Sequence, residues 1–502
     1  MKLIVPDEIK NICLRLEKAG HQAYLVGGCV RDVLLNREPK DWDVATNAKP
    51  EEVQQLFENS VYENDFGTVG VKTESENPKL KVVEVTTFRI EGKYTDKRHP
   101  DDIKFAKTIK EDLSRRDFTI NAMALQLQSA KRKVPIKNDS QFAIRDLLIV
   151  DPYGGEKDLK ERIIRTVGIP EERFNEDALR LMRAVRFSTE LDFQIDLNTR
   201  RAIEKLSGLL EAIAKERIRD EFIKILMAYR AADGVILLEE LNLLKNILPE
   251  IREGLGCGQN KHHIYTVFEH NVRALDYAAK KDYPLLIRLA SLLHDVGKPK
   301  SKRGDGPDST FHGHEVIGGK MTVKILDRLR FPKDFVEQCA HLVRQHLFYY
   351  NVGEVSAAGV RRFLARVGPE NIDDLIKIRE ADRIGSGVPK AVPYKLRHLL
   401  FMIDKVKSDP ISPKMLKVNG GDVMKVAKIE PSPKVGFILA VLLEEVLDDP
   451  QKNTREYLEE KIKKLSQLSE KELKRMSEKA KETKLEYESE EEGKIKEKHH
   501  VK

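Results

Sequence analysis

The stretch that decides the fold of the amino-terminal part is YLVGGCVRDVLLNREPKDWDVAT, residues 24–46. Its first three residues are apolar and β-prone, and Gly27 and Gly28 follow them directly. Glycines permit a tight turn and let the backbone approach a phosphate closely. A short helix is expected next; its amino terminus attracts phosphate, and Arg31 adds a fixed positive donor there. Asp32 is placed to hold Arg31, although the two residues could also form an ordinary surface ion pair.

The same stretch ends with two carboxylates, Asp41 and Asp43, on a second β-prone segment. Alternate residues of a strand point to the same face, so the two carboxylates project together while Trp42 faces away. Two carboxylates beside a glycine turn suit a pair of hard cations that bridge a triphosphate. Asp-x-Asp alone would indicate two solvated acids at a strand end. The nearby glycine turn favours nucleotidyl transfer instead.

The composition sets the class of protein. The chain has 502 residues, enough for several domains, and 34% of them are charged. The net charge of +7 favours an anionic partner but does not by itself specify nucleic acid. The four scattered cysteines form no Cys-x-x-Cys pair, so neither a zinc knuckle nor a disulfide framework is indicated. No apolar run is long enough to span a membrane, and we expect a cytoplasmic protein.

The periodicity of apolar residues predicts an α+β fold. A helix is expected near residues 6–19, and strands are expected at 23–26, 43–46, 67–72 and 81–90. From about residue 170 the pattern has a 3.6-residue period, and strands become rare. The predicted domains are an α/β head at 1–150, a helical neck at 151–255, a histidine-rich domain at 256–390 and a helical body at 391–465. Residues 466–502 are rich in Lys, Glu and Ser and predict either a charged helix or a disordered tail.

Further candidate residues of the head lie downstream. Glu84 is the single acid of a β-branched strand, so it faces either solvent or a functional cleft, where it would be a third carboxylate near the metals. Arg115 and Arg116 precede a helical segment and could bind ribose and phosphate. Asp117 and Asn121 lie one turn apart on that segment.

Asp177 and Arg180 can be interpreted from the chemistry of the bases. Three residues apart on a helix, they would share a face. A carboxylate accepts hydrogen bonds and a guanidinium donates them. Cytosine and adenine present an amine beside a bare ring nitrogen, whereas uracil and guanine present a carbonyl beside an N–H. The pair therefore matches C and A, and each unpaired polar group in a mismatch costs about 1–3 kcal/mol. Without the upstream motifs, a surface salt bridge would be the first interpretation.

The ordered motifs resemble those of class II tRNA nucleotidyltransferases, the bacterial and eukaryotic CCA-adding enzymes with the poly(A) polymerases as relatives. They are VGGCVRDVLL…DWDVAT, RRDFTINAMA, DPYGGEKDLKERIIR, EDALRLMRAVRF and ERIRDEF. The resemblance implies that Asp41 and Asp43 bind two Mg²⁺ ions, that Arg116 and Asp117 contact the ribose, and that Asp177 and Arg180 are a protein template. It also implies that Asp151 and Arg165 couple head to neck, that Arg217 and Glu221 support the neck, and that residues 391–465 grip the tRNA elbow. The predicted catalytic set is Asp41, Asp43 and Glu84, and the predicted nucleotide-binding set is Gly27, Gly28, Arg31, Asp32, Arg116, Asp117, Asn121, Asp177, Arg180 and Arg183.

Two segments favour a full CCA-adding enzyme within this family. Residues 91–112 resemble the intact flexible loop of members that add the final A, and residues 66–70 resemble the CCA-adding type. The alternatives are an enzyme that adds only the terminal A, and a poly(A) polymerase. The expected partners are tRNA, CTP and ATP, with neither DNA nor a membrane.

A second constellation is a histidine cluster, with eight of the thirteen histidines between residues 262 and 346. His270, His294, Asp295 and Asp382 follow the order H…HD…D on predicted helices and suit a divalent metal. A lone helical His is usually a core residue, but four matched positions favour a site that resembles an HD phosphohydrolase domain. His314 and His346 are further candidate ligands, His312 and His341 weaker ones, and His262 and His263 are taken as structural.

The resemblance implies hydrolysis of phosphomonoesters or 2′,3′-cyclic phosphates at damaged tRNA ends, with Ni, Mn, Co or Mg as the metal. A metal site that binds an ion without catalysing hydrolysis is the alternative for this domain. Two other interpretations remain: an HD hydrolase with a vestigial head, and an RNA-binding scaffold without chemistry. The intact residues Asp41, Asp43, Asp177 and Arg180 argue against the first, and the complete carboxylate and histidine sets argue against the second.

Overall fold

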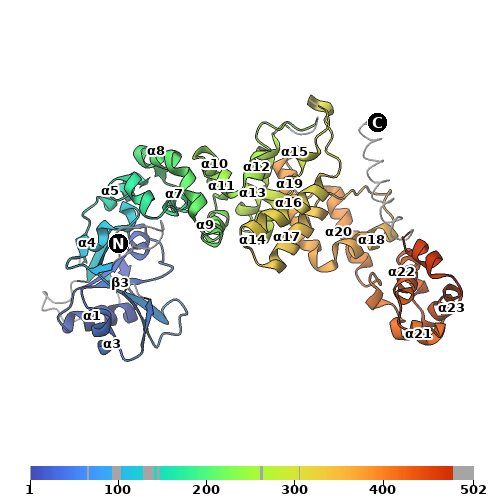
Figure 1. Cartoon of the computed structure of the whole chain (residues 1–502), viewed down its shortest axis with the longest axis horizontal. Helices are drawn as coiled ribbons and strands as arrows, with labels where there is room; N and C mark the ends of the chain where they lie inside the picture. Colours follow the sequence, from blue (N-terminus) through green and yellow to red (C-terminus); the bar gives the residue numbers. More distant parts are fainter. Residues whose placement is uncertain are drawn as a thin grey trace. The chain divides into compact units, whose positions relative to one another are not determined.

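A computed structural model describes residues 2–64, 67–92, 103–127, 141–143, 147–260, 264–304 and 306–478. It contains two compact units, which Figure 1 shows in sequence colours. The first unit comprises residues 1–252 and 325–332, and the second comprises 253–324 and 333–502. No described helix combines the length and apolar character that a membrane span requires.

A seven-stranded sheet forms the framework of the first unit, with strand order β11-β9-β2-β3-β6-β5-β4. Strands β3 and β6 are parallel, and the other neighbouring pairs are antiparallel. The strands are β2 (Ala23–Val26), β3 (Asp43–Thr46), β4 (Ser60–Asn64), β5 (Thr68–Lys72), β6 (Val82–Thr87), β9 (Ala124–Leu127) and β11 (Leu147–Val150). Short two-stranded ladders join β1 (Lys2–Ile4) to β10 (Gln141–Ala143), β7 (Arg89–Glu91) to β8 (Ile103–Phe105), and β12 (Ile163–Ile164) to β13 (Gln194–Ile195).

Helices complete the first unit. Those of the head are α1 (Asp7–Lys18), α2 (Gly28–Leu34), α3 (Pro50–Leu56), α4 (Ile109–Ser114) and the 3₁₀ turn η1 (Thr119–Asn121). Those that follow are α5 (Gly155–Glu161), α6 (Pro170–Glu176), α7 (Arg180–Leu191), α8 (Leu197–Leu206), η3 (Ser207–Ala212), α9 (Lys215–Met227), α10 (Ala231–Glu240), α11 (Leu244–Ile247) and α12 (Pro249–Arg252). The expected helix at 6–19 and strands at 23–26 and 43–46 are confirmed, and the segment expected as one strand at 81–90 divides into β6 and β7.

All regular elements described in the second unit are helices, apart from one isolated bridge between Arg303 and Thr310. Its elements are α13 (Val267–Lys280), α14 (Leu285–Leu293), α15 (Lys298–Ser301), η4 (Gly306–Asp308), α16 (His314–Arg328), α17 (Lys333–Gln345), α18 (Ala357–Val367), η5 (Pro369–Asn371), α19 (Ile372–Gly385), α20 (Tyr394–Val406), η6 (Pro413–Met415), α21 (Gly420–Ala427), α22 (Pro433–Asp448), η7 (Pro450–Lys452) and α23 (Arg455–Ser466).

The beginning of the charged tail joins a core. Residues 470–478 are helical, and Leu473 is fully buried in a cluster with Leu458, Ile462 and Leu465. This part of the tail is therefore packed against α21–α23, where Leu473 supplies the apolar contact. Residues 479–502 lie outside the described part of the chain.

Candidate active site and metal centre

The three predicted catalytic carboxylates lie near the amino-terminal ends of two adjacent central strands of the sheet. Asp43 begins β3 and pairs in register with Glu84 of the parallel strand β6. Asp41 precedes β3, and Trp42 between the two aspartates is buried. Burial of Asp43 together with the charges of Asp41 and Glu84 raises the pKa of Asp43 to about 6, although Arg116 opposes the shift. Three acids that repel one another in this way fit a site for cations.

The glycine turn lies directly against these carboxylates. Gly27 has a φ of +77°, and a Cβ on it would lie 2.9 Å from Arg116 Nη1 and 3.3 Å from Asp43 Oδ2. A Cβ on Gly28 would lie 3.6 Å from Arg31 Nη2 and 3.9 Å from Asp41 Oδ1. Each glycine therefore lies beside one carboxylate and one guanidinium. A side chain at Gly27 would be strained by the backbone and would also collide with Arg116.

A chain of hydrogen bonds connects the glycine turn to helix α7. Arg31 donates to Asp32 Oδ1 (2.9 Å) and to Asn121 Oδ1 (2.9 Å), and Asn121 donates to Asp117 Oδ1 (3.2 Å). Arg183 of α7 donates to Asp117 Oδ2 at 2.7 Å. Burial would raise the pKa of Asp117, but Arg183 and Arg180 outweigh it and hold that pKa well below its ordinary value. Asp117 therefore stays ionised as the centre of this chain.

The expectation that Asp177 and Arg180 share one continuous helix is wrong. Helix α6 ends at Glu176, Asp177 is extended (φ −133°, ψ 107°), and α7 begins at Arg180. The break has a local cause, because Asp177 Oδ1 accepts the Leu179 backbone N–H at 3.0 Å, as the aspartate of an Asx turn does. The two residues remain near each other in sequence, but the i,i+3 helical geometry does not position them.

Each of the two residues instead has its own support. Arg217 of α9 donates to Asp177 Oδ2 at 2.9 Å. Arg180 donates to Glu176 Oε2 (2.6 Å) and to two backbone carbonyls, those of Arg173 (3.3 Å) and Arg115 (3.1 Å). The contact from Arg217 agrees with its predicted supporting role. The predicted neck residue Glu221 is buried and accepts from Arg186 at 3.1 Å.

The residues expected to couple head and neck make ordered contacts. Asp151 accepts the backbone N–H groups of Gly155 (2.7 Å) and Glu156 (2.9 Å) and so caps α5. Arg165 pairs with Asp158 (3.2 Å) and Asp196 (2.7 Å). Asp158 also accepts from Thr119 of η1 at 2.6 Å.

Two important residues were missed by sequence reasoning. Asp112 is buried and binds both Arg115 (2.9 Å) and Arg116 (3.4 Å), which orients the arginine pair. Phe187 is buried, and the guanidiniums of three arginines surround its ring, with centroid distances of 5.2 Å for Arg31, 5.3 Å for Arg183 and 4.3 Å for Arg186. The i,i+4 spacing of Arg183 and Phe187 on one helix was the available signal; Arg31 is too distant in sequence to be foreseen.

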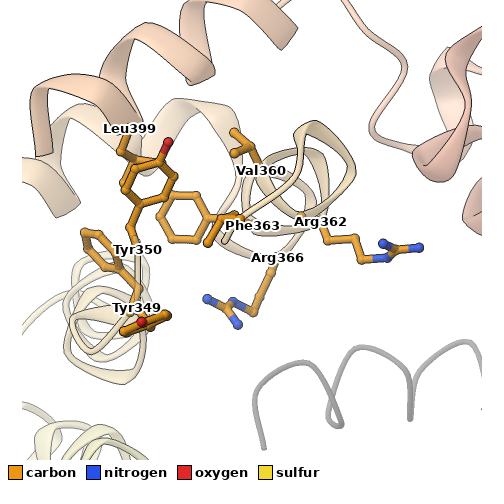
Figure 2. A pocket seen from close by; sticks show the side chains of 10 residues that line it. Tyr349, Tyr350, Val360, Arg362, Phe363, Arg366 and Leu399 are labelled. Carbon is orange, nitrogen blue, oxygen red and sulfur yellow. The ribbon is translucent and has the colours of Figure 1, made fainter. Parts of the chain in front are cut away.

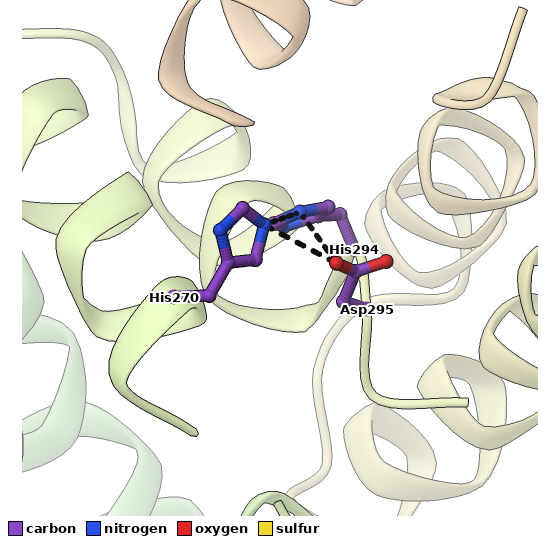
Figure 3. A group of neighbouring side chains, drawn as sticks. All are labelled: His270, His294 and Asp295. Carbon is purple, nitrogen blue, oxygen red and sulfur yellow. Dashed lines mark hydrogen bonds and ion pairs between the residues drawn. The ribbon is translucent and has the colours of Figure 1, made fainter. Parts of the chain in front are cut away.

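The HD residues gather in the second unit around Asp295. His270 Nε2 lies 2.8 Å from His294 Nε2 and 3.2 Å from Asp295 Oδ2, as Figure 3 shows. Asp382 Oδ1 lies 3.3 Å from His270 Nε2. The other carboxylate oxygen, Asp295 Oδ1, faces His314 Nε2 (3.3 Å) and His346 Nε2 (3.5 Å). Two metal-compatible trios therefore share Asp295, one with His270 and His294 and one with His314 and His346.

Three of the histidines are oriented by backbone carbonyls. His294 Nδ1 lies 2.8 Å from Ser291 O, His314 Nδ1 lies 2.7 Å from Phe311 O, and His346 Nδ1 lies 2.7 Å from Val343 O. A carbonyl can only accept, so each Nδ1 carries a proton, and Nε2 is the ring nitrogen that a metal can take once any proton on it is displaced. This is the tautomer that a metal site requires.

The carboxylates, Lys298 and the histidines of the cluster shift one another's pKa values. Burial would raise the pKa of Asp295, but Lys298 (Nζ at 2.6 Å) and His294 hold it well below its ordinary value. Burial would lower the pKa of His294, yet Asp295 and Asp382 raise it to about 10. Burial lowers the pKa of His346. The two buried carboxylates thus attract positive charge where the imidazole nitrogens converge, which fits a divalent cation.

The remaining histidine predictions separate clearly. Among the described contacts, His341 makes no hydrogen bond to the cluster around Asp295. Its Nε2 bonds Val367 O at 2.7 Å, so His341 belongs to the packing of α17. His262 and His263 lie outside the described residues. Residues 93–102 of the loop expected at 91–112 also lie outside them, as does Phe66.

Comparison with known families agrees with this geometry. Residues 23–165 match the poly A polymerase head domain, residues 192–255 match the probable RNA and SrmB binding site of polymerase A, and residues 263–385 match the HD domain. Fold and site therefore define a nucleotidyltransferase with an attached HD domain.

Individual relatives identify the family. The A-adding tRNA nucleotidyltransferase of Deinococcus radiodurans is 36% identical over 68% of this chain and 76% of its own length. The CCA-adding enzyme of Enterococcus faecalis is 32% identical over 91% of this chain and 97% of its own length. The crystal structure of the Bacillus stearothermophilus CCA-adding enzyme in complex with CTP has a TM-score of 0.63 and 26% identity, covering 91% of this chain and 96% of that one. The chain belongs to the class II tRNA nucleotidyltransferases, the family of the CCA-adding enzymes.

Proposed function

We propose that this protein adds CCA to the 3′ end of tRNA from CTP and ATP without a nucleic-acid template. The proposal rests on the group of three carboxylates in the head. Asp43 and Glu84 pair across parallel strands, beside Asp41 and the Gly27–Gly28 turn. Similarity to a CCA-adding enzyme over nearly the full length of both chains supports the same activity. The proposal places the reaction in the cytoplasm.

The mechanism follows from what each group can do. Asp41 and Asp43, with Glu84 beside them, would hold two Mg²⁺ ions, which activate the tRNA 3′-hydroxyl and neutralise the pyrophosphate that leaves. Arg31 and Arg116 border the glycine turn and would bind the triphosphate. The 3′-hydroxyl would give up its proton to water and form a bond from its oxygen to the α-phosphorus. The bond from the α-phosphorus to the oxygen shared with the β-phosphate would break, and pyrophosphate would leave.

The base would be selected by Asp177 and Arg180. Asp177 accepts and Arg180 donates, so the pair complements the amine and ring nitrogen of C and A. Their separate supports, Arg217 for Asp177 and Glu176 for Arg180, keep both side chains oriented without a nucleic-acid partner. Asp117, Asn121 and Arg183 would contact the nucleotide or hold the groups that do.

One assay tests this activity. The full-length protein is incubated with Mg²⁺, tRNA that lacks its 3′ end, and labelled CTP or ATP. Addition of two C residues followed by one A supports the proposal. Addition of A alone, and only to tRNA that already ends in CC, would identify an A-adding enzyme, the second candidate that the Deinococcus relative favours. Long A tracts would indicate a poly(A) polymerase.

For the HD domain we propose metal-dependent hydrolysis of a phosphomonoester or 2′,3′-cyclic phosphate at an RNA end. His270, His294, Asp295 and Asp382 would hold one divalent ion, and Asp295, His314 and His346 could hold a second. The described Nδ1 contacts support ligation through Nε2. Hydrolysis of a 2′,3′-cyclic nucleotide by metal-loaded protein tests the proposal. Tight metal binding without turnover would leave a structural metal site, and turnover without any nucleotidyl transfer would indicate a vestigial head.

A further inference from the structure

Both candidate carboxylate ligands of the HD centre are paired with a cation. Lys298 Nζ lies 2.6 Å from Asp295 Oδ2, and Arg379 Nη1 lies 2.6 Å from Asp382 Oδ2. Lys298 also donates to Gln259 Oε1 at 2.7 Å, which fixes its ammonium group. The two carboxylates therefore face the histidines with their charge already balanced.

A third acid beside the histidines is paired in the same way. Glu315 Oε2 lies 3.8 Å from His314 Nδ1, and Glu315 Oε1 lies 3.4 Å from Arg344 Nη1. The three cations differ in exposure, since the side chain of Lys298 is 10% exposed, that of Arg379 27% and that of Arg344 39%. The two arginines are therefore accessible to an anion that arrives from solvent.

Arg379 is held beside Asp382 by a packed aromatic cluster. Its guanidinium lies 5.6 Å from the ring centroid of Phe348, a distance at which a cation is attracted to a ring face. The Phe348 ring lies 5.1 Å from that of Phe363, and both residues line the small cavity shown in Figure 2. That cavity measures about 20 Å³, enough for one water molecule but not for a nucleotide, so we assign these rings to packing.

The three ion pairs set the charge of a metal-loaded centre. Histidine ligates a metal as the neutral imidazole, so the negative groups among the described contacts are the three carboxylates, and the three cations cancel them. A divalent ion bound here would keep both of its positive charges uncompensated. With unpaired carboxylates, the ligands themselves would neutralise the same ion. The loaded centre is therefore suited to an anion, and its attraction grows with the charge of that anion.

We propose that Lys298, Arg379 and Arg344 are specificity-determining residues that make the HD centre select dianionic phosphates over monoanionic ones. A terminal phosphomonoester carries nearly two negative charges at neutral pH, whereas a 2′,3′-cyclic phosphate is a diester with a single negative charge. The inference rests on the proposed hydrolytic function of the HD domain, and it narrows the substrate to an RNA end or nucleotide that bears a terminal phosphomonoester.

The first measurement is metal affinity. The full-length protein and its variants are titrated with Mn²⁺, and free Mn²⁺ is followed by electron paramagnetic resonance, with Asp295→Asn as the blank for ions bound by the head. Arg379→Met removes a positive charge and should tighten Mn²⁺ binding by about threefold or more, because it removes repulsion. Arg379→Lys keeps the charge and should bind Mn²⁺ like the unchanged protein.

The second measurement is anion preference. Mn²⁺-loaded protein is titrated by calorimetry with methylphosphonate, at a pH where it is a dianion, and with dimethylphosphinate, a monoanion of nearly the same size. Neither compound contains an ester bond that could be hydrolysed. The unchanged protein and Arg379→Lys should prefer methylphosphonate by about tenfold or more, and Arg379→Met should reduce this preference by about threefold or more. Arg344→Met should reduce it less, because Arg344 is more exposed, and this exposure also makes the variant safe to fold.

The outcomes separate this inference from the proposed function. A protein that binds no more Mn²⁺ than Asp295→Asn would overturn both. Mn²⁺ binding with equal affinity for the two anions would overturn only the inference, and so would a preference that Arg379→Met leaves unchanged while it melts at the same temperature as Arg379→Lys. Weaker Mn²⁺ binding by Arg379→Met would show that Arg379 positions Asp382 and would overturn its assignment to specificity.

Discussion

Asp43→Asn should stabilise the head while it abolishes nucleotidyl transfer. Burial and the charges of Asp41 and Glu84 raise the pKa of Asp43 from 3.8 to about 6. At about 1.4 kcal/mol for each pH unit, the ionised carboxylate destabilises the folded head by at most about 3 kcal/mol. Partial exposure of the side chain reduces the expected gain to about 1–2 kcal/mol. Asparagine has nearly the same shape and carries no charge, so it removes this cost.

The pH dependence gives the sharper test. Because the pKa is raised in the folded state, the destabilisation is absent below the ordinary value of 3.8, grows up to about pH 6 and is complete above it. Asp43→Asn should therefore exceed the unchanged protein in stability at pH 7 and equal it near pH 4. Urea unfolding without Mg²⁺ can be followed through Trp42, the single tryptophan of the chain, which is buried between the two aspartates.

The control for this experiment is Asp41→Asn. Asp41 is exposed, so its replacement should also abolish transfer but should stabilise the head by less. A gain for Asp43→Asn that is equally large at pH 4 and pH 7, or no gain at pH 7, would refute the reasoning. Mg²⁺ with CTP should stabilise the unchanged protein and should have little effect on Asp43→Asn.

Three further predictions concern the residue that supports Asp177, the metal centre around Asp295, and the buried ring of Phe187. Arg217→Ala removes the donor to Asp177, so incorporation of UTP relative to CTP should rise about tenfold in single-nucleotide assays; an unchanged ratio would contradict template support. Asp295→Asn should remove most bound divalent metal, as measured by elemental analysis, without lowering nucleotidyl transfer, and loss of both would argue against two independent centres. Phe187→Ala should destabilise the head by about 3–5 kcal/mol in urea unfolding, and Phe187→Leu by less, since the ring is buried among three arginines.

Local features of the site could be predicted from the sequence. The strand, glycine turn and helix at residues 23–34 depend on neighbouring residues, and so does the buried position of Trp42 between two aspartates. The Arg31–Asp32 pair is also local. Each of these follows from propensity and alternation within a few residues.

Contacts between distant segments could not be predicted with the same certainty. The pairing of Asp43 with Glu84 depends on strand order, so the sequence left Glu84 between solvent and cleft. The break between α6 and α7 was missed because an i,i+3 spacing of charges is equally compatible with a helix and with a turn. An Asp side chain can accept a backbone N–H two residues on and so favours a turn over a continuous helix, and this signal could have marked the break at Asp177.

The arrangement of the candidate histidine ligands has a local structural cause. His294 directly follows the last residue of α14, and His346 directly follows the last residue of α17. The last carbonyls of a helix have no partner within it, and here Ser291 O and Val343 O accept the Nδ1–H of the histidine three residues later. His314 makes the same contact with Phe311 O at the start of α16. A histidine in this position satisfies a backbone acceptor and points Nε2 away from it in one step. Three separate segments can thus present the same ring nitrogen, Nε2, to Asp295. No periodicity in the sequence requires this orientation, but the local Nδ1 contact of each histidine produces it.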